Sequence, residues 1–423
     1  MIPDPAGDQE VHRRQARDRW RLTTTRGIRG FVDGAVSVVL SAYLTLVGYS
    51  GREIGVIVAA MMLGSAALTL LTGVYGHRLA RRSILLAGAW LMVLTGVTYA
   101  TTSMFVALLV MGVIGTMNPS SGDVSVFLPM EQSLLPATAA DDRRTAMFAR
   151  YAFVGSIAGA LGSLAAGLPD WIVAHSSVDR TSALRGVFAV YAAAGVAAFI
   201  IYRSLSPGIE PAAQHTPQRL GASRAIVYRL AAVFSLDAFG GGFIVQSLLA
   251  LWLYRRFDLS VAVAGTLLFW TGVCSAFSAF VSARLAARIG LVRTMVFTHL
   301  PAQLFLILAA LMPNLTLAVV FLIARSLLSA MDVPARNSYV MAVVTPPERA
   351  AAASITNVPR SLAAALPPIA AGWMLDHSTF GWPLIIAGTL KAIYDLLLLA
   401  MFRNIRPPEE MPLPPEPELP KPS

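Results

Sequence analysis

Charged side chains are scarce in this sequence, since only 13% of its 423 residues are Asp, Glu, Lys or Arg. A typical soluble domain has about 25%. Hydrophobic residues make up 56% of the chain, and the mean hydropathy is +0.64. Such a chain has too few polar residues to cover a globular surface in water. The sequence therefore predicts a protein whose main solvent is the lipid bilayer.

Cysteine is almost absent as well, because Cys274 is the only one and lies inside an apolar run. This excludes an intrachain disulfide and a cysteine-based zinc cluster. The six histidines are dispersed along the chain, and no GxxxxGK[ST] motif for nucleotide phosphates is present. We expect no metal, no cofactor and no enzymatic activity. The first 22 residues contain no apolar core, so no cleavable signal peptide is visible.

What the sequence has in abundance is apolar segments of about 20 residues, the length that crosses the hydrocarbon core of a bilayer. We count twelve, and each is expected to be a transmembrane helix. The windows are 28–49, 54–75, 83–101, 103–128, 146–168, 186–204, 228–252, 261–282, 294–312, 314–335, 351–373 and 381–402. Pro119 and Pro129 in or after the fourth window, and Pro367 and Pro368 in the eleventh, are expected to kink their helices.

Arginines set the expected orientation of these spans. They are frequent before span one and in the loops after spans two, four, six, eight and ten, and rare in the opposite loops. Basic loops stay in the cytoplasm, so both termini are expected there, in a multi-pass protein of the bacterial cytoplasmic membrane. The formal net charge of +10 is scattered in small clusters, which does not favour nucleic acid as a partner.

A polar segment at 205–225 divides the chain into two halves of six spans. We expect an N-terminal cytoplasmic segment at 1–23, six-helix bundles at 24–204 and 226–404, and a linker at 205–225. The tail at 405–423 is rich in Pro and Glu, a composition that cannot pack a core, so disorder is expected there.

The two halves repeat each other at an offset of about 204 to 210 residues. Four landmarks recur in the same order in both halves. They are Asp33 and Asp237, the loops GHRLARRS (76–83) and ARLAARIG (283–290), GDV (122–124) and MDV (331–333), and Arg150 and Arg360.

On these features the sequence resembles the major facilitator superfamily over residues 24 to 404. The loop GVYGHRLARR (73–82) is similar to the family's motif between spans two and three, although His77 stands where the family usually has Asp. The resemblance implies two pseudo-symmetric bundles related by a rotation of about 180° around the membrane normal. It also implies a gating role for the cytoplasmic loops, through Gly73, Gly76, Arg78, Arg81, Arg82, Arg284 and Arg288. The alternative interpretation is that the arginines of these loops only set the orientation of the spans in the membrane.

Ionisable residues at bilayer depth are costly and mark functional sites by default. The resemblance places Asp33, Asp123, Asp237 and Asp332 on four spans that line a central cavity. These aspartates and Glu131 are the candidates for proton coupling, with Asp33 ranked ahead of Asp237. Permanent ion pairs that lock helices together remain the alternative. Their expected charge partners are Arg150, Arg325, Arg336 and Arg360.

Other polar residues of the spans receive weaker assignments. Gln246, Asn337, Tyr339 and Asn357 are cavity candidates, with satisfied hydrogen bonds between helices as the other reading. Lys391 and Asp395 are four residues apart in span twelve, so we expect them to neutralise each other on one helix face. Arg325 can attract an anionic substrate or neutralise Asp332, two turns away.

The sequence thus predicts a secondary active transporter that moves a small solute by alternating access and uses protons as the coupling ion. Export of small amphipathic molecules ranks first on family frequency. Proton-coupled uptake of a small metabolite or organic anion stays open, and a membrane receptor without transport is a distant alternative. We expect a monomer.

Overall fold

The computed structural model describes residues 5–75, 79–120, 126–138, 144–206, 209, 220–221, 223–345, 348–403 and 405, and it is helical nearly throughout. The first half contains α1 (Pro5–Leu46), α2 (Gly51–Tyr75), α3 (Arg81–Thr101), α4 (Phe105–Ile114), α5 (Phe127–Leu134), the 3₁₀ turn η2 (Leu135–Thr138), α6 (Arg144–Ala165), α7 (Leu168–His175) and α8 (Arg180–Arg203). The second half contains α9 (Arg224–Gly242), α10 (Gln246–Phe257), α11 (Val261–Ile289), α12 (Leu291–Leu311), α13 (Leu315–Ser329), α14 (Asp332–Ala342), α15 (Arg349–Ala365), α16 (Pro367–His377) and α17 (Trp382–Phe402).

These helices reproduce the twelve expected spans. Within the described residues, ten helices are long and apolar enough to cross a membrane. The fourth and eleventh windows are the two that fall outside this group, and both are interrupted. The fourth divides into α4 and α5 on either side of Pro119, and the eleventh divides into α15 and α16 at Pro367. Both interruptions coincide with the prolines expected to kink these spans.

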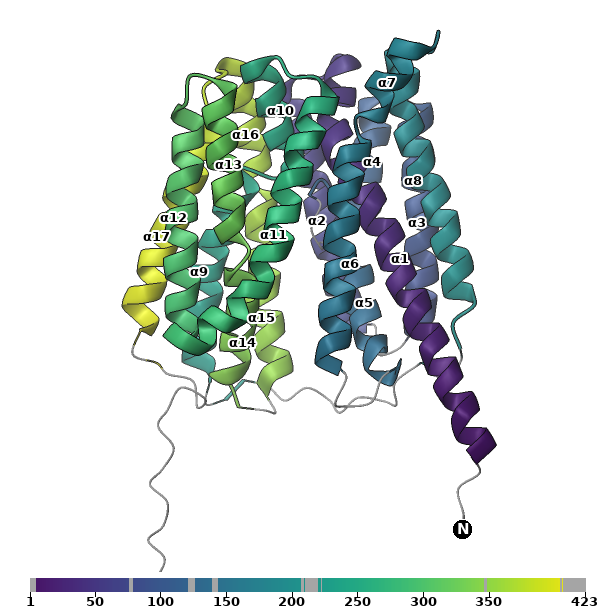
Figure 1. Cartoon of the computed structure of the whole chain (residues 1–423), viewed down its shortest axis with the longest axis vertical. Coiled ribbons are helices and arrows are strands. Elements are labelled where there is room, and N and C mark those ends of the chain that lie inside the picture. Colours follow the sequence, from purple (N-terminus) through teal and green to yellow (C-terminus); the bar gives the residue numbers. More distant parts are fainter. Residues whose placement is uncertain are drawn as a thin grey trace, which may run out of the picture.

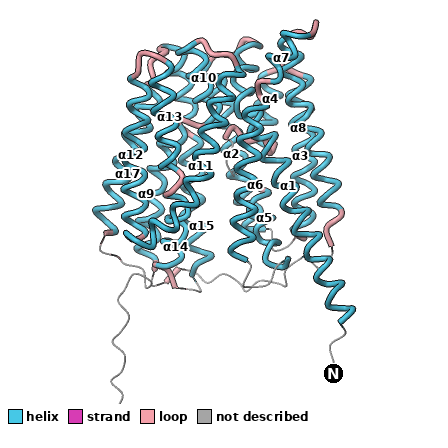
Figure 2. The backbone as a smooth tube through the Cα atoms, in the orientation of Figure 1, coloured by secondary structure: helices cyan, strands magenta, loops and turns pink. Residues whose placement is uncertain are grey.

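Figure 1 shows the two halves side by side, with the first half in purple to teal and the second in green to yellow. The N terminus lies below the bundle, and we call this the inner end; α7 and α10 lie at the opposite, outer end. Helices run between these two ends throughout, and the described loops lie mostly at the ends (Figure 2). This arrangement is that of a polytopic helical membrane protein.

Small residues set the closest helix packing in the first bundle. Along α1 and α6, Gly34 approaches Gly159 so closely that a Cβ on Gly34 would lie 2.0 Å from the Gly159 carbonyl oxygen. No larger side chain fits there. The small residues of GSIAGALG (155–162) in span five permit this approach, because small residues allow backbones of membrane helices to meet.

The apolar core is continuous at the outer end and divided at the inner end. One large buried cluster draws on both halves, from Val38 in α1 and Ile57 in α2 to Leu251 in α10 and Leu375 in α16. A second cluster around Phe127 contains only first-half residues. A third, around Phe234, contains only second-half residues. The two bundles therefore share one core towards the outer end, whereas each has its own core towards the inner end.

Polar contacts between the bundles strengthen the outer end. Asp376 in α16 accepts hydrogen bonds from the amides of Gly51 and Arg52 at 2.6 and 2.7 Å, and from Arg255 at 2.8 Å. The hydroxyl of Tyr254 donates to the Val38 carbonyl at 2.9 Å. We call the contacts of Asp376 the outer clamp, since they join α2, α10 and α16 across the two halves.

Candidate functional site

The first bundle buries one charged cluster, centred on Glu131 in α5. The Glu131 carboxylate is fully buried and accepts hydrogen bonds from Thr25 at 2.8 Å and Tyr202 at 2.6 Å, as well as from Arg29 and Tyr151. The Arg29 guanidinium also lies 4.3 Å from the ring centroid of Phe127. We call these residues the Glu131 cluster. It ties α1, α5, α6 and α8 together at the inner end, where the first bundle has its own core.

The second bundle buries a larger cluster, centred on Asp237 in α9. One carboxylate oxygen of Asp237, Oδ1, accepts a hydrogen bond from Lys391 Nζ at 2.5 Å. The other, Oδ2, lies 3.4 Å from Arg336 Nη1, which also donates to Asp332 at 2.9 Å. All four side chains are buried. Asp237 thus holds together the charged residues of three helices, α9, α14 and α17.

Histidine 299 extends this cluster away from its centre. The Nδ1 atom of His299 in α12 lies 3.0 Å from both carboxylate oxygens of Asp395. Its other ring nitrogen, Nε2, lies 3.9 Å from Oδ1 of Asp237. We call the six residues Asp237, His299, Asp332, Arg336, Lys391 and Asp395 the Asp237 cluster.

One prediction for this region is wrong. Lys391 and Asp395 do not neutralise each other on α17, although they are four residues apart. Lys391 reaches Asp237 instead, and Asp395 is bound by His299. Gly240 on α9 allows this, because a Cβ there would lie only 3.0 Å from Cγ of Lys391. The absence of a side chain lets the lysine stem cross α9 and bring its ammonium group to Asp237.

Two arginines of the second bundle stand out because they have no direct partner. Arg325 in α13 and Arg360 in α15 are half-buried, and neither makes a hydrogen bond or ion pair with any residue that the structure describes. The Nε atom of each is buried without a partner. Both guanidinium groups lie within electrostatic range of Asp237. Each is therefore a cation at the edge of the Asp237 cluster with unused hydrogen-bond donors.

The two arginines that the repeat relates, Arg150 and Arg360, occupy different surroundings. Arg360 shares one face of α15 with Asn357 and Ser361, both accessible. Arg150 is exposed and shares a face of α6 with Ile157 and Leu161. It forms no ion pair with a carboxylate that the structure describes. The expected pairing of Arg150 with an aspartate of its own half is therefore not observed among these residues.

The remaining candidates are placed as follows. Asp33 in α1 is half-buried within electrostatic range of Arg29 and Tyr191. Tyr339 is buried and donates to the Ile405 carbonyl at 3.2 Å, so its hydroxyl holds the end of α17 instead of lining a cavity. Gln246 donates to Ser163 at 3.1 Å between the bundles, and Asn337 is accessible on α14. Asp123, Gly76 and Arg78 lie outside the described residues.

The loop candidates lie at the helix ends, as expected. Gly73 belongs to the last turns of α2, and Arg81 and Arg82 begin α3. The Arg82 guanidinium donates to the carbonyl oxygen of Arg203 at the end of α8. Arg284 and Arg288 are exposed near the end of α11. A position at the inner end is expected both if these loops take part in gating and if they only set the membrane topology.

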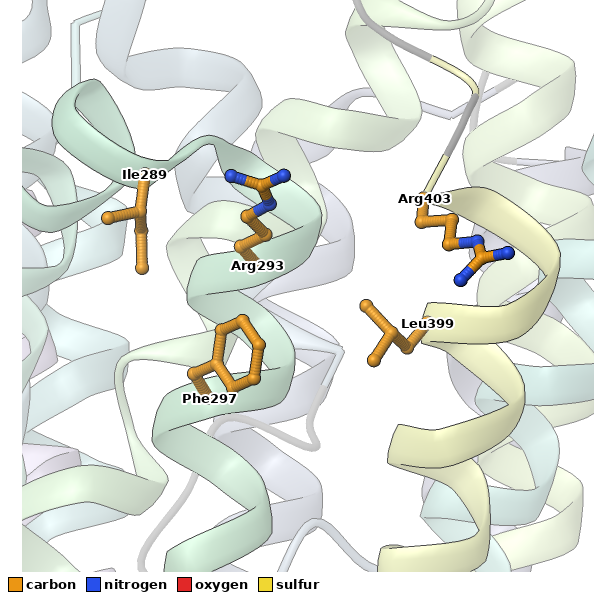
Figure 3. A pocket seen from close by; sticks show the side chains of 5 residues that line it. All are labelled: Ile289, Arg293, Phe297, Leu399 and Arg403. Atoms are coloured by element: carbon orange, nitrogen blue, oxygen red, sulfur yellow. The ribbon is translucent and has the colours of Figure 1, made fainter.

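A separate crevice of about 500 Å³ opens on the flank of the second bundle, where α11, α12 and α17 approach the inner end (Figure 3). Arg293 and Arg403 lie at its upper edge in this view, and Phe297 and Leu399 lie below them. The residues that line it are Ile289, Arg293, Phe297, Leu399 and Arg403. None of them belongs to either charged cluster, so the clusters and not this crevice are the candidate site.

Sequence reasoning missed five members of these clusters, namely Thr25, Arg29, Tyr151, Tyr202 and His299. Arg29 follows an Arg-rich segment and reads as a topology signal. Tyr151 and Tyr202 look like ordinary apolar residues of their spans, and nothing in their spacing points to Glu131. The role of His299 had one available signal, since it is the only histidine inside an expected span.

Comparison with known proteins agrees with this architecture. A family model described as Major Facilitator Superfamily matches residues 22–234 and again residues 230–423. The membrane protein YJR124C of Saccharomyces cerevisiae, described as uncharacterised, is 24% identical over 407 residues, covering 88% of this chain and 91% of the yeast protein.

Solved transporters share the fold. A mutant of the nucleoside transporter NupG superposes with a TM-score of 0.72 at 15% identity, covering 91% of this chain and 100% of that one. The xylose transporter XylE from E. coli, in an inward-open conformation, gives 0.69 at 15% identity, covering 90% and 95%. The family model, which matches both halves of the chain, indicates a secondary transporter. The chain belongs to the major facilitator superfamily.

Proposed function

We propose that the chain is a proton-coupled transporter of a small anionic solute. The observation that supports this is the pair of arginines, Arg325 and Arg360, that lack a direct partner among the described residues. A cation at the centre of a membrane span costs about 2.5 to 3.5 kcal/mol on insertion scales. Two such cations without a direct counter-ion are explained if an anionic solute supplies the missing charge.

The surroundings of these arginines favour such a ligand. Arg360 experiences repulsion from Arg336 and attraction from Asp237 and Asp332, so an anion beside it would relieve the repulsion. Asn357 and Ser361 on the same face of α15 offer further hydrogen bonds. A guanidinium group can bind a carboxylate or phosphate through two parallel hydrogen bonds. We infer that the solute carries a group of this kind.

We infer alternating access from the way in which the bundles meet. The shared core and the outer clamp join the bundles at the outer end, which supports a state that is closed outside and open to the inner end. The opposite state requires the contacts of Asp376 to break. Because an anion is driven out of a negatively charged cytoplasm, its uptake needs a source of energy, and a co-transported proton provides one. This ranks uptake of an anion above export of amphipathic molecules.

We further propose that the protein works in a bacterial cytoplasmic membrane as a monomer, with both termini inside. The basic loops support this orientation. The two bundles of one chain contain every residue that the proposed site requires.

A ligand-stabilisation screen on the purified protein tests the function. A ligand that binds the folded state stabilises it by about 2.7 kcal/mol at a hundred times its Kd. Mono- and dicarboxylates and small phosphate esters should raise the melting temperature, whereas cationic amphiphiles should not. Arg325→Gln and Arg360→Gln should abolish the effect of the anions.

The matched control for this screen is Arg150→Gln, the same substitution at an exposed arginine of the first bundle. It should respond to anions as the wild type does. Stabilisation by cationic amphiphiles alone would contradict the proposal, as would unchanged anion responses in both Arg325→Gln and Arg360→Gln.

A further inference from the structure

His299 is the only histidine of the described residues that is buried within a membrane-spanning helix. Its ring lies between two carboxylates, with Asp395 at 3.0 Å from Nδ1 and Asp237 at 3.9 Å from Nε2. An aromatic neighbour, Tyr394, meets the ring edge to face at 5.8 Å between centroids. Imidazole is the side chain whose charge changes between about pH 5 and pH 8. The position of this ring therefore places a titratable group between two carboxyl groups.

Hydrogen bonding determines which nitrogen is available for a proton. An ionised carboxylate only accepts hydrogen bonds, so Nδ1 carries the hydrogen that faces Asp395. In the neutral ring, Nε2 is then left with its lone pair towards Asp237. A proton that binds there forms one N–H bond, and its release to water breaks that bond again. The loaded ring is an imidazolium cation with a carboxylate on each side.

We propose that Nε2 of His299 is the binding site of the coupling proton, and that this proton is taken up together with the anionic solute. The proposal rests on the proposed function for the presence of the anion. The site of the proton itself follows from the geometry of His299, Asp395 and Asp237.

Charge balance gives the sign of the coupling. The ionisable groups around His299 are Lys391 and Asp395 on α17, Asp237 on α9, Arg336 and Asp332 on α14, Arg325 on α13 and Arg360 on α15, with the Tyr394 phenol beside them. Four cations face three carboxylates, so one positive charge is in excess when His299 is neutral. A proton on His299 raises the excess to two.

An anion bound at Arg325 and Arg360 lowers this excess by one. The proton therefore binds more readily when the anion is present. By thermodynamic reciprocity, the anion binds more tightly when His299 is protonated. The coupled species are one proton and one anion, and they move in the same direction. The charge balance therefore favours symport of a proton with an anion over exchange of a proton for an outgoing cation.

Lys391 links proton binding to the helices. Its ammonium group and Nε2 of His299 face the same oxygen of Asp237, at 2.5 Å and 3.9 Å. A protonated His299 competes with Lys391 for that oxygen. Lys391 lies against Gly240 and Gly241, directly before α9 ends at Gly242. Loading the proton thus weakens a contact at the point where span seven is interrupted.

Titration of the histidine ring tests the proton site without any ligand. The full chain, labelled with ¹⁵N-histidine in detergent micelles, should show a ring whose nitrogen signals change between about pH 5 and pH 8. That signal should be absent in His299→Gln and present in His377→Gln, which removes an exposed ring at the end of α16. A His299 ring that keeps one protonation state across this range would overturn the proposal.

The anion arm uses benzoate and salicylate as probes, since both stay singly charged between about pH 5 and pH 8. In the wild type, their affinity should rise by about 5- to 150-fold from pH 8 to pH 5, the usual range of coupling between two sites. His299→Gln, and His299→Asn as a second variant if the first folds poorly, should make the affinity independent of pH. Asp33→Asn should keep the pH dependence.

These outcomes separate the proposals. Loss of the pH dependence in Asp33→Asn alone would assign the proton to Asp33 and refute the site at His299. If neither probe binds at any pH while His299 titrates, the anionic solute is contradicted and the proton site stands. If a probe binds with equal affinity at both pH values, the coupling is refuted although the anion site remains.

Discussion

Replacing Glu131 by glutamine separates its two possible roles, as a proton carrier and as a structural anion. The substitution keeps the shape of the side chain and removes its charge. It also places an NH₂ group among the donors of Thr25, Arg29, Tyr151 and Tyr202, which all point at the carboxylate. Arg29 is 1% exposed, so its guanidinium group is then left buried without the Glu131 counter-ion.

The magnitude follows from these contacts. Breaking a buried ion pair by removing one partner costs about 3 to 5 kcal/mol. For a unit of 150 to 250 residues, each kcal/mol lowers the melting temperature by about 2 to 4 °C. The first bundle is of this size, so we expect its midpoint to fall by roughly 6 to 20 °C. The double variant Arg29→Met with Glu131→Leu should be more stable than Glu131→Gln, because it leaves no unpaired charge.

Thermal unfolding of the purified protein, followed by intrinsic fluorescence, provides the measurement. The matched control is Glu10→Gln, which removes the same group from an exposed pair with Arg14 and should leave the midpoint unchanged. The structural role of Glu131 is refuted if the Glu131→Gln variant has the same melting temperature as the wild type. A stable Glu131→Gln variant that had lost proton-driven accumulation would make Glu131 a carrier of the proton.

Four further predictions follow. Reporter fusions should place residues 77–82, 141–145, 205–225 and 284–293 in the cytoplasm and residues 170–184 and 376–380 outside; an external reporter at 205–225 would reverse the orientation. In thermal unfolding, Asp237→Asn should be destabilised by about 3 to 5 kcal/mol, because Lys391 and Arg336 lose a buried counter-ion. Asp33→Asn should melt close to the wild type, because Asp33 is half-buried, and equal losses in both variants would contradict this contrast. Hydrogen bonds from Ser223 and the Gly221 amide lower the pKa of Glu348 from its ordinary value of 4.5 to about 2. The hydrogen bond between Glu348 and Gly221 should therefore be fully formed above pH 4.5 and be lost as the pH falls towards 2. Amide hydrogen exchange at Gly221 checks it, and Glu348→Gln should already be unprotected at pH 6. Asp258, which ends α10 with a φ of 51°, should gain stability on replacement by glycine, by at most about 1 kcal/mol; a lower melting temperature would show that its side chain contributes more than its backbone costs.

The sequence predicted the spans closely because hydrophobic length and helix ends are local properties. The window 381–402 became α17 (Trp382–Phe402), and the window 261–282 lies within α11. Interruptions of spans four and eleven were also predictable from their prolines. The N-terminal segment was different, since α1 begins at Pro5 and continues without a break into span one. A search for apolar windows does not detect a polar helix, so the part of α1 that precedes the window 28–49 was missed.

The charged site was only partly predictable, because pairing depends on which helix faces are in contact. Asp237, Asp332 and Arg336 were identified as charges at bilayer depth. The partner of Lys391 was not, since spacing along one helix favoured Asp395 and only the approach of α9 at Gly240 gives Lys391 a better acceptor. For Arg150 and Arg360, matching in sequence could not reveal that their side chains occupy different faces of their helices.

The two bundles are joined by a segment that is held at both of its ends. Asp18 in α1 accepts hydrogen bonds from the amide and hydroxyl of Ser206, and Ile209 is buried in the core of the first bundle. At the other end, Leu220 packs on the second bundle and Glu348 binds Gly221. Ten residues lie between Ile209 and Leu220, and eleven steps of an extended chain reach about 36 to 40 Å. The covalent connection therefore sets only an upper limit, about 36 to 40 Å, on the distance between these two anchor points.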